Sequence, residues 1–304
     1  MFLAPKPFNN LYPCCFCPLF PGPLPCYALS LVITRRTSPL PLILLLTATV
    51  LLIPLRRNVL FIPAELQLYT GYLAALGFVL TCFREPKERA RIFGTLGLML
   101  ALLALAPVNT GLGPAHVLTL GAVFVAVLVL PPLLLGPGSP LSFKWLPDKL
   151  DRVDILYTLS AVPLAWGGFA LYFGVLSPQT PFNWSLPPEP DGDALFSLFM
   201  GINAVGIWDE LFFINVCFAC LRALYGFRTA NLGQAVIYAS VLYDMAFTGW
   251  GPVFIYVLAL TQGFMYERSK VLIYVVIVHL IVDYFLFQAI VGAYYPQLEV
   301  WWHP

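Results

Sequence analysis

The stretch VLIYVVIVHLIVDYFLFQAIVGA, residues 271–293, indicates the fold of this chain most clearly. It is almost wholly apolar and longer than the roughly 20 residues that a helix needs to cross a bilayer. Its acidic and basic side chains are His279 and Asp283, whose spacing of four places them on one helix face. Ionisable groups at membrane depth cost free energy and mark functional sites by default. The stretch therefore predicts a transmembrane helix that carries part of a buried polar site.

The composition extends this prediction to the whole chain. Of 304 residues, 60% are hydrophobic and 10% are charged, whereas a soluble domain is about a quarter charged. We therefore predict an all-α, polytopic transmembrane helical bundle of about eight to nine spans, with the lipid bilayer as its partner. A net charge of +1 gives no indication of a nucleic-acid partner. The apolar stretches lie at 38–55, 64–83, 92–107, 115–135, 154–177, 194–221, 231–247, 252–267 and 271–293.

The distribution of polar residues divides the chain into four predicted parts. Residues 1–37 form a Pro- and Cys-rich N-terminal tail, and residues 38–193 form N-terminal transmembrane helices with almost no interior charge. Residues 194–293 form core helices that hold nearly all the intramembrane polar groups, and 294–304 form a short C-terminal tail. We expect the functional site among the core helices.

Basic residues alternate between the loops. The loops 108–114, 178–193 and 248–251 contain no Lys or Arg. The other loops are basic at 84–91, 144–152, 222–228 and 267–270. The positive-inside rule then places the basic loops in the cytoplasm of an integral protein, which we assign to the plasma membrane. Arg56 and Arg57 conflict with this alternation.

A second pair of acids precedes the His279 helix. Asp209 and Glu210 are adjacent in an apolar run, and successive helical residues lie about 100° apart, so both can border one cavity without pointing at one target. A rise of about 1.5 Å per residue is compatible with all four ionisable groups lining one cavity in the inner half of the bilayer. A carboxylate can act as a general base on water, and a histidine can orient that water or stabilise an oxyanion. The same groups could instead clamp two helices together or carry protons.

Three motifs in residues 203–286 resemble those of the CPBP family of CAAX proteases and bacteriocin-processing enzymes (Abi), which are intramembrane endopeptidases. DELFFI, at 209–214, falls on the family's Glu-Glu-x-x-x-Arg motif. ASVLYDMAFTGWG, at 239–251, falls on the region of the Phe-x-x-x-His motif. TQGFMYERSKVLIYVVIVHLIVD, at 261–283, matches the region of the His-x-x-x-Asn/Asp motif, with His279 and Asp283 intact.

The chain departs from the family pattern in the first two motifs. Asp209 replaces the first Glu, and Ile214 replaces the Arg. Phe247 stands where the second motif has its His, and a Phe side chain offers neither a proton nor a lone pair. Asp244, three residues earlier, is the alternative polar group of that segment. These changes put standard proteolysis in doubt and leave open whether the chain is an enzyme.

The resemblance implies the following activity and roles. If active, the chain hydrolyses a peptide bond of a membrane-associated or prenylated protein or peptide. Asp209 and Glu210 would supply the base, while His279 and Asp283 would orient the water or stabilise the oxyanion. The alternatives are a catalytically impaired member that binds a membrane peptide or protein, and a small proton-coupled transporter. The family mechanism is described both as metal-dependent and as glutamate-dependent, and one histidine with carboxylates is a poor zinc set, so we assign no metal.

Overall fold

In a computed structural model of the chain, residues 37–54, 62–106, 113–176, 186, 188–243 and 250–298 are described. These residues form helices and no strands, which confirms the all-α prediction. The predicted tails lie outside this description except for Thr37 and residues 294–298. The helices are α2 (Leu40–Leu52), α3 (Ala64–Cys82), α4 (Lys87–Leu105), α5 (Pro114–Leu135), α6 (Arg152–Leu171), α7 (Gly192–Asp209), α8 (Ala219–Leu224), α9 (Phe227–Leu242), α10 (Gly251–Ser269) and α11 (Ile273–Tyr294), with π-helical segments η2 (Tyr172–Leu176) and η3 (Glu210–Phe218).

Within the described residues, each predicted apolar stretch falls on one continuous helical segment. In the described part of the chain, 4 segments are long and apolar enough to cross a membrane: Pro114–Leu135, Arg152–Leu176, Gly192–Leu224 and Ile273–Tyr294. Gly192–Leu224 joins α7, η3 and α8 without a break. These segments identify an integral membrane protein.

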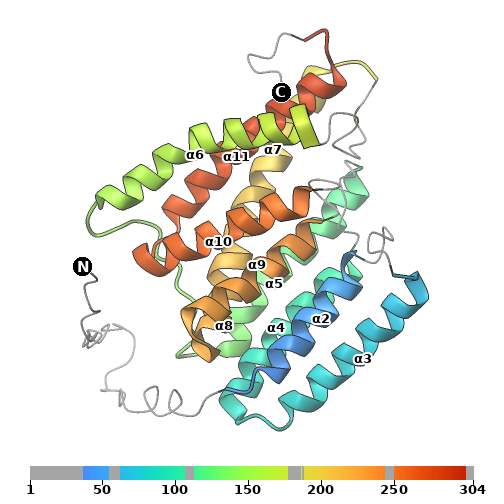
Figure 1. Cartoon of the computed structure of the whole chain (residues 1–304), viewed down its shortest axis with the longest axis vertical. Coiled ribbons are helices and arrows are strands. Elements are labelled where there is room, and N and C mark those ends of the chain that lie inside the picture. Colours follow the sequence, from blue (N-terminus) through green and yellow to red (C-terminus); the bar gives the residue numbers. More distant parts are fainter. Residues whose placement is uncertain are drawn as a thin grey trace. The chain divides into compact units, whose positions relative to one another are not determined.

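The helices of the predicted core pack side by side. α11 lies against α6 and α7, and α9 lies along α10 (Figure 1). A short connection turns α10 into α11, because Lys270 ends α10 with a positive φ of 57°. The backbone amide of Leu272 then donates to the carbonyl of Lys144, so the start of α11 is attached to the segment that precedes α6.

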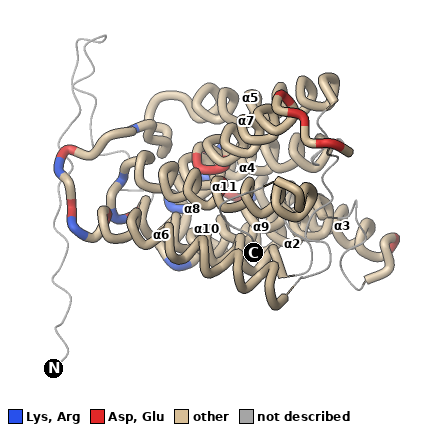
Figure 2. Tube along the Cα trace, turned by 90° about the horizontal axis from the view of Figure 1, so that it is seen from above, with Lys and Arg blue, Asp and Glu red and all other residues tan. Residues whose placement is uncertain are grey.

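Most of the charge lies at the helix ends. Figure 2 shows the Lys and Arg segments gathered on one side of the described chain. There Arg222, at the end of α8, pairs with Glu267 of α10 at 3.0 Å. Arg268 of α10 pairs with Asp151, the N-cap of α6, at 2.6 Å. These ion pairs place the start of α6 and the ends of α8 and α10 at the same end of the bundle.

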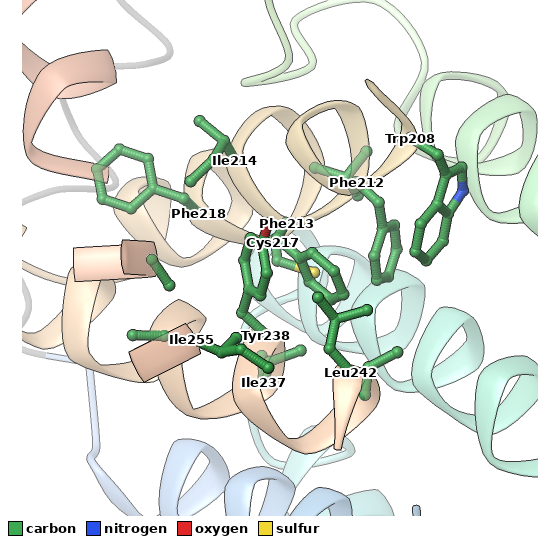
Figure 3. Packing of buried hydrophobic residues seen from close by; sticks show 14 of the residues in the cluster. Trp208, Phe212, Phe213, Ile214, Cys217, Phe218, Ile237, Tyr238, Leu242 and Ile255 are labelled. Carbon is green, nitrogen blue, oxygen red and sulfur yellow. The ribbon is translucent and has the colours of Figure 1, made fainter. Parts of the chain in front are cut away.

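Aromatic side chains fix α7 and η3 against their neighbours (Figure 3). Trp208 stacks on Phe124 of α5 with ring centroids 3.7 Å apart, and its indole N–H donates to the Phe124 carbonyl at 3.0 Å. Phe213 of η3 packs on Tyr238 of α9 at 4.1 Å. The helix that carries Asp209 and Glu210 is therefore held on two sides by large buried rings.

Candidate active site

The two adjacent acids lie where an α-helix becomes a π-helix. Asp209 is the last residue of α7, and Glu210 is the first of η3. A π-helix is wound more widely than an α-helix and is frequent at functional sites. Glu210 Oε1 lies 2.7 Å from His279 Nδ1, and Asp209 Oδ2 lies 3.6 Å from His279 Nε2. The two acids therefore converge on opposite nitrogens of one imidazole.

The structure brings together all four residues predicted for the site. Asp283, one turn beyond His279 on α11, places its Oδ1 3.5 Å from His279 Nε2. Asp209, Glu210, His279 and Asp283 are only 1, 0, 5 and 4% exposed. In the described residues, the ion pairs of all three carboxylates are made with this histidine. His279 is thus the centre of a buried cluster of three carboxyl groups.

Gly206, which the sequence analysis did not single out, allows α11 to approach α7 at this point. A Cβ added at Gly206 would collide with Asp283 Oδ2 and would lie 2.8 Å from His279 Cδ2. Any larger residue would push both side chains away from Asp209, which follows Gly206 by one turn on the same face. In the sequence, the signal for this role was a glycine three residues before Asp209, an acid within a membrane span.

Two further side chains, also not predicted for the site, bind the Glu210 carboxylate. The Tyr238 hydroxyl of α9 lies 3.3 Å from Glu210 Oε1 and 3.0 Å from His279 Nδ1. The Gln262 amide of α10 donates to Glu210 Oε1 at 3.2 Å. Gln262 stood out as an intramembrane amide in the sequence, whereas Tyr238 resembled any aromatic residue of an apolar helix.

The proton positions around His279 depend on the charge of Glu210. When Glu210 is ionised it only accepts hydrogen bonds, and His279 Nδ1 is then the donor to Oε1 at 2.7 Å. Nε2 faces Asp209 and Asp283 at distances too long for strong direct hydrogen bonds. Among the described residues, Asp209 Oδ1, Glu210 Oε2 and Asp283 Oδ2 find no hydrogen-bond partner. The Nε2 side of the ring therefore has acceptor groups available for an added water or substrate.

Of the altered motif positions, Ile214 lies within the described residues. Ile214 is fully buried in the apolar core, where the family pattern has an arginine. Phe247 and Asp244, the two candidates of the second motif, lie outside the described residues. The side chain that α9 supplies to the site within the described chain is Tyr238.

The described donor set fits zinc poorly. In the part of the chain that the structure describes, no three His, Cys, Asp or Glu side chains are arranged to hold a metal ion. His279 Nδ1 is occupied by Glu210 and Tyr238, which leaves one nitrogen and carboxylates. Structural and catalytic zinc sites usually combine several nitrogen or sulfur ligands. No step is therefore assigned to a metal.

One comparison with known proteins matches the segment that carries the site. No curated protein and no solved structure matches the chain. Residues 191–285 match the family model described as Type II CAAX prenyl endopeptidase Rce1-like. The matched segment runs from the N-cap of α7 to two residues beyond Asp283 and contains all four predicted site residues. For this segment, the match confirms the resemblance to the CPBP (CAAX protease) family that the three motifs predicted.

Proposed function

We propose that the chain is a membrane-embedded endopeptidase that hydrolyses a peptide bond of a membrane-associated or prenylated protein or peptide. One observation carries the proposal: the His279 ring is held at Nδ1 by Glu210 and flanked at Nε2 by Asp209 and Asp283. A carboxylate that orients a histidine, with a second carboxylate at the other nitrogen, suits general acid–base chemistry. The family match at residues 191–285 supports the same reaction class.

In this reaction Asp209 acts as the base. A water beside His279 Nε2 can contact the nitrogen and a neighbouring carboxylate oxygen together, because these atoms lie only about 3.5 Å apart. Asp209 takes one proton as the water oxygen bonds to the peptide carbonyl carbon. The C–N bond then breaks, the proton passes to the leaving amine, and the carboxylate is restored. Asp283 orients the water from the other side.

Glu210 has a different task from its neighbour. Its Oε1 accepts hydrogen bonds from His279, Tyr238 and Gln262, so this oxygen is engaged in holding the other side chains. By holding the Nδ1 proton, it leaves the Nε2 lone pair to accept a hydrogen bond from the water. We therefore assign the base to Asp209 alone and the orientation of His279 to Glu210.

The membrane setting follows from charge and burial. The basic helix ends face the cytoplasm of the plasma membrane by the positive-inside rule. The site residues are at most 5% exposed, so a peptide reaches them only when the surrounding helices move. The partners are then the bilayer and a peptide or lipidated protein.

A second candidate function is the binding of a membrane peptide without cleavage. Phe247 in place of the family's second-motif histidine favours it, because one expected proton-transfer group is absent. In that case the cluster around His279 serves to hold α7, α9, α10 and α11 together.

Cleavage assays on the purified protein separate the two functions. The substrates are quenched fluorescent peptides with and without a C-terminal farnesylated cysteine, in phosphatidylcholine vesicles. Asp209→Ala and His279→Ala should each lower the turnover by about 10²- to 10⁴-fold. Asn203→Ala is the control, since its amide donates to the Phe199 carbonyl of the same helix. Wild-type protein that binds these peptides without cleaving them would establish the binding function instead.

A further inference from the structure

The Glu210 carboxylate lacks the cationic partner that the family motif would provide four residues later. Ile214 occupies that position and is buried among apolar side chains. A buried carboxylate without donors is costly, because it has lost its hydration. In this chain, neutral donors from two other helices surround Glu210 Oε1: the Tyr238 hydroxyl of α9 and the Gln262 amide of α10.

We propose that Tyr238 and Gln262 are positioning residues that hold Glu210, and through it His279, in the orientation that leaves Nε2 facing Asp209 and Asp283. The effect on rate rests on the proposed function, whereas the effect on the imidazole does not. Neither residue needs to touch a substrate, because both act on the Nδ1 side of the ring.

Packing keeps the Tyr238 hydroxyl in place. The side chain is fully buried, and its ring lies 4.1 Å from that of Phe213, which belongs to the same η3 segment as Glu210. The hydroxyl contacts both partners of the Glu210–His279 pair, at 3.3 and 3.0 Å. Because Nδ1–H donates to Glu210, the hydroxyl proton points to the carboxylate and its oxygen faces the imidazole N–H.

The orientation of the Gln262 amide is also determined. Its Oε1 accepts from the Tyr157 hydroxyl of α6 at 2.7 Å, so its Nε2 is turned to the opposite side. There Nε2 donates to Glu210 Oε1 at 3.2 Å and to the Val275 carbonyl at 2.9 Å. Val275 precedes His279 by one turn of α11. Gln262 thus connects α6 and α10 to both halves of the Glu210–His279 pair.

The two donors compensate for the missing cation in a specific way. Hydrogen bonds to an ionised group are stronger than those between neutral groups. Together they stabilise the charge of Glu210, and that charge keeps the proton on Nδ1. Removing one donor weakens this preference and allows the imidazole to tilt or to change tautomer.

The test compares Tyr238→Phe with Tyr266→Phe. Tyr266 is a matched control, since its buried hydroxyl bonds Asn215 Oδ1 at 3.1 Å, outside the site. The chain has 3 histidines, so ¹⁵N-histidine NMR of the full protein in micelles is tractable, and a His279→Ala sample identifies the His279 signals. Gln262→Leu is the second variant if Tyr238→Phe folds poorly.

We expect Tyr238→Phe and Gln262→Leu to shift the His279 nitrogen resonances toward the Nε2–H tautomer and to lower kcat on the order of tenfold with little change in KM. Tyr266→Phe should leave both unchanged. Equal His279 spectra in Tyr238→Phe, Gln262→Leu and Tyr266→Phe would overturn the positioning role, even if the wild type cleaves peptides. Shifted spectra without wild-type turnover would sustain the positioning role and overturn the proposed proteolysis.

Discussion

Glycines allow close approach in several helix pairs of this molecule, and two of these pairs fill the space with opposite chemistry. In α2–α3, a Cβ at Gly71 would lie 2.6 Å from Leu52 Cδ2. In α7–α11, a Cβ at Gly206 would collide with the Asp283 carboxylate. One glycine receives a flexible apolar side chain, and the other receives an ionisable group of the site. The same packing device therefore builds an apolar frame in one region and sets the geometry of the buried polar cluster in the other.

The buried polar groups of the two regions differ in the same way. Gln67 of α3 is fully buried, and its amide donates to the Leu51 carbonyl at 3.1 Å, which is a local bond between neighbouring helices. Glu210 instead accepts donors from three different helices, α9, α10 and α11. A neutral isolated bond can be lost at low cost, whereas a charge in a shared network cannot.

The largest effect expected from this difference is on stability. His279→Leu removes the shared partner of three buried carboxylates, and we expect a loss of about 3 to 5 kcal/mol in the free energy of unfolding. Gln67→Leu should change it by about 1 kcal/mol or less. Denaturant titration in mixed micelles measures both. Equal losses for the two variants would contradict the view that the C-terminal network depends on charge.

Glycine substitutions provide the next largest effect. Gly206→Ala must displace Asp283 and His279, so we expect a destabilisation of about 1 to 3 kcal/mol together with loss of peptide cleavage. Gly71→Ala meets the end of a leucine side chain that can rotate away, and the gain in helix propensity of about 0.5 to 1 kcal/mol offsets part of the strain. Thermal unfolding and turnover should be measured on both. Full turnover in Gly206→Ala would show that the close approach of α11 is dispensable.

Hydropathy sufficed to predict the helices, because each apolar stretch of this chain is long enough to form one. The polar site was also accessible from the sequence, since His279, Asp283, Asp209 and Glu210 are unusual in such surroundings. Their convergence on one imidazole was not, because the sequence analysis assumed α-helical geometry and the chain continues from Glu210 as a π-helix. Such a local change in winding depends on packing, here on rings such as Trp208 and Phe213.

Tyr238 and Gly206 escaped prediction for a different reason. A tyrosine in an apolar helix and a glycine in a membrane span both have ordinary packing roles, and their function depends on which neighbour they meet. That neighbour comes from α11 in both cases, some 40 to 75 residues later in the chain. Contacts at such separations are products of tertiary structure and leave no local pattern.

The smallest expected effect concerns the Asp151–Arg268 ion pair at the helix ends. This pair is exposed to solvent, whereas His279 is buried. The pKa of Asp151 is held below its ordinary value by the hydrogen bond from the Val153 amide and by Arg268. Its charged form therefore stabilises the fold above the unfolded pKa of about 3.9, and this contribution is lost as the pH falls through the lower folded pKa.

Asp151→Asn keeps a side chain able to cap α6 and removes only the charge. We expect a Tm slightly below that of the wild type at pH 6 to 7, with the difference shrinking in high salt and at low pH, because exposed pairs are screened. A large, salt-independent Tm loss at pH 7 would mean that this end of the bundle depends on charge as strongly as the buried cluster does.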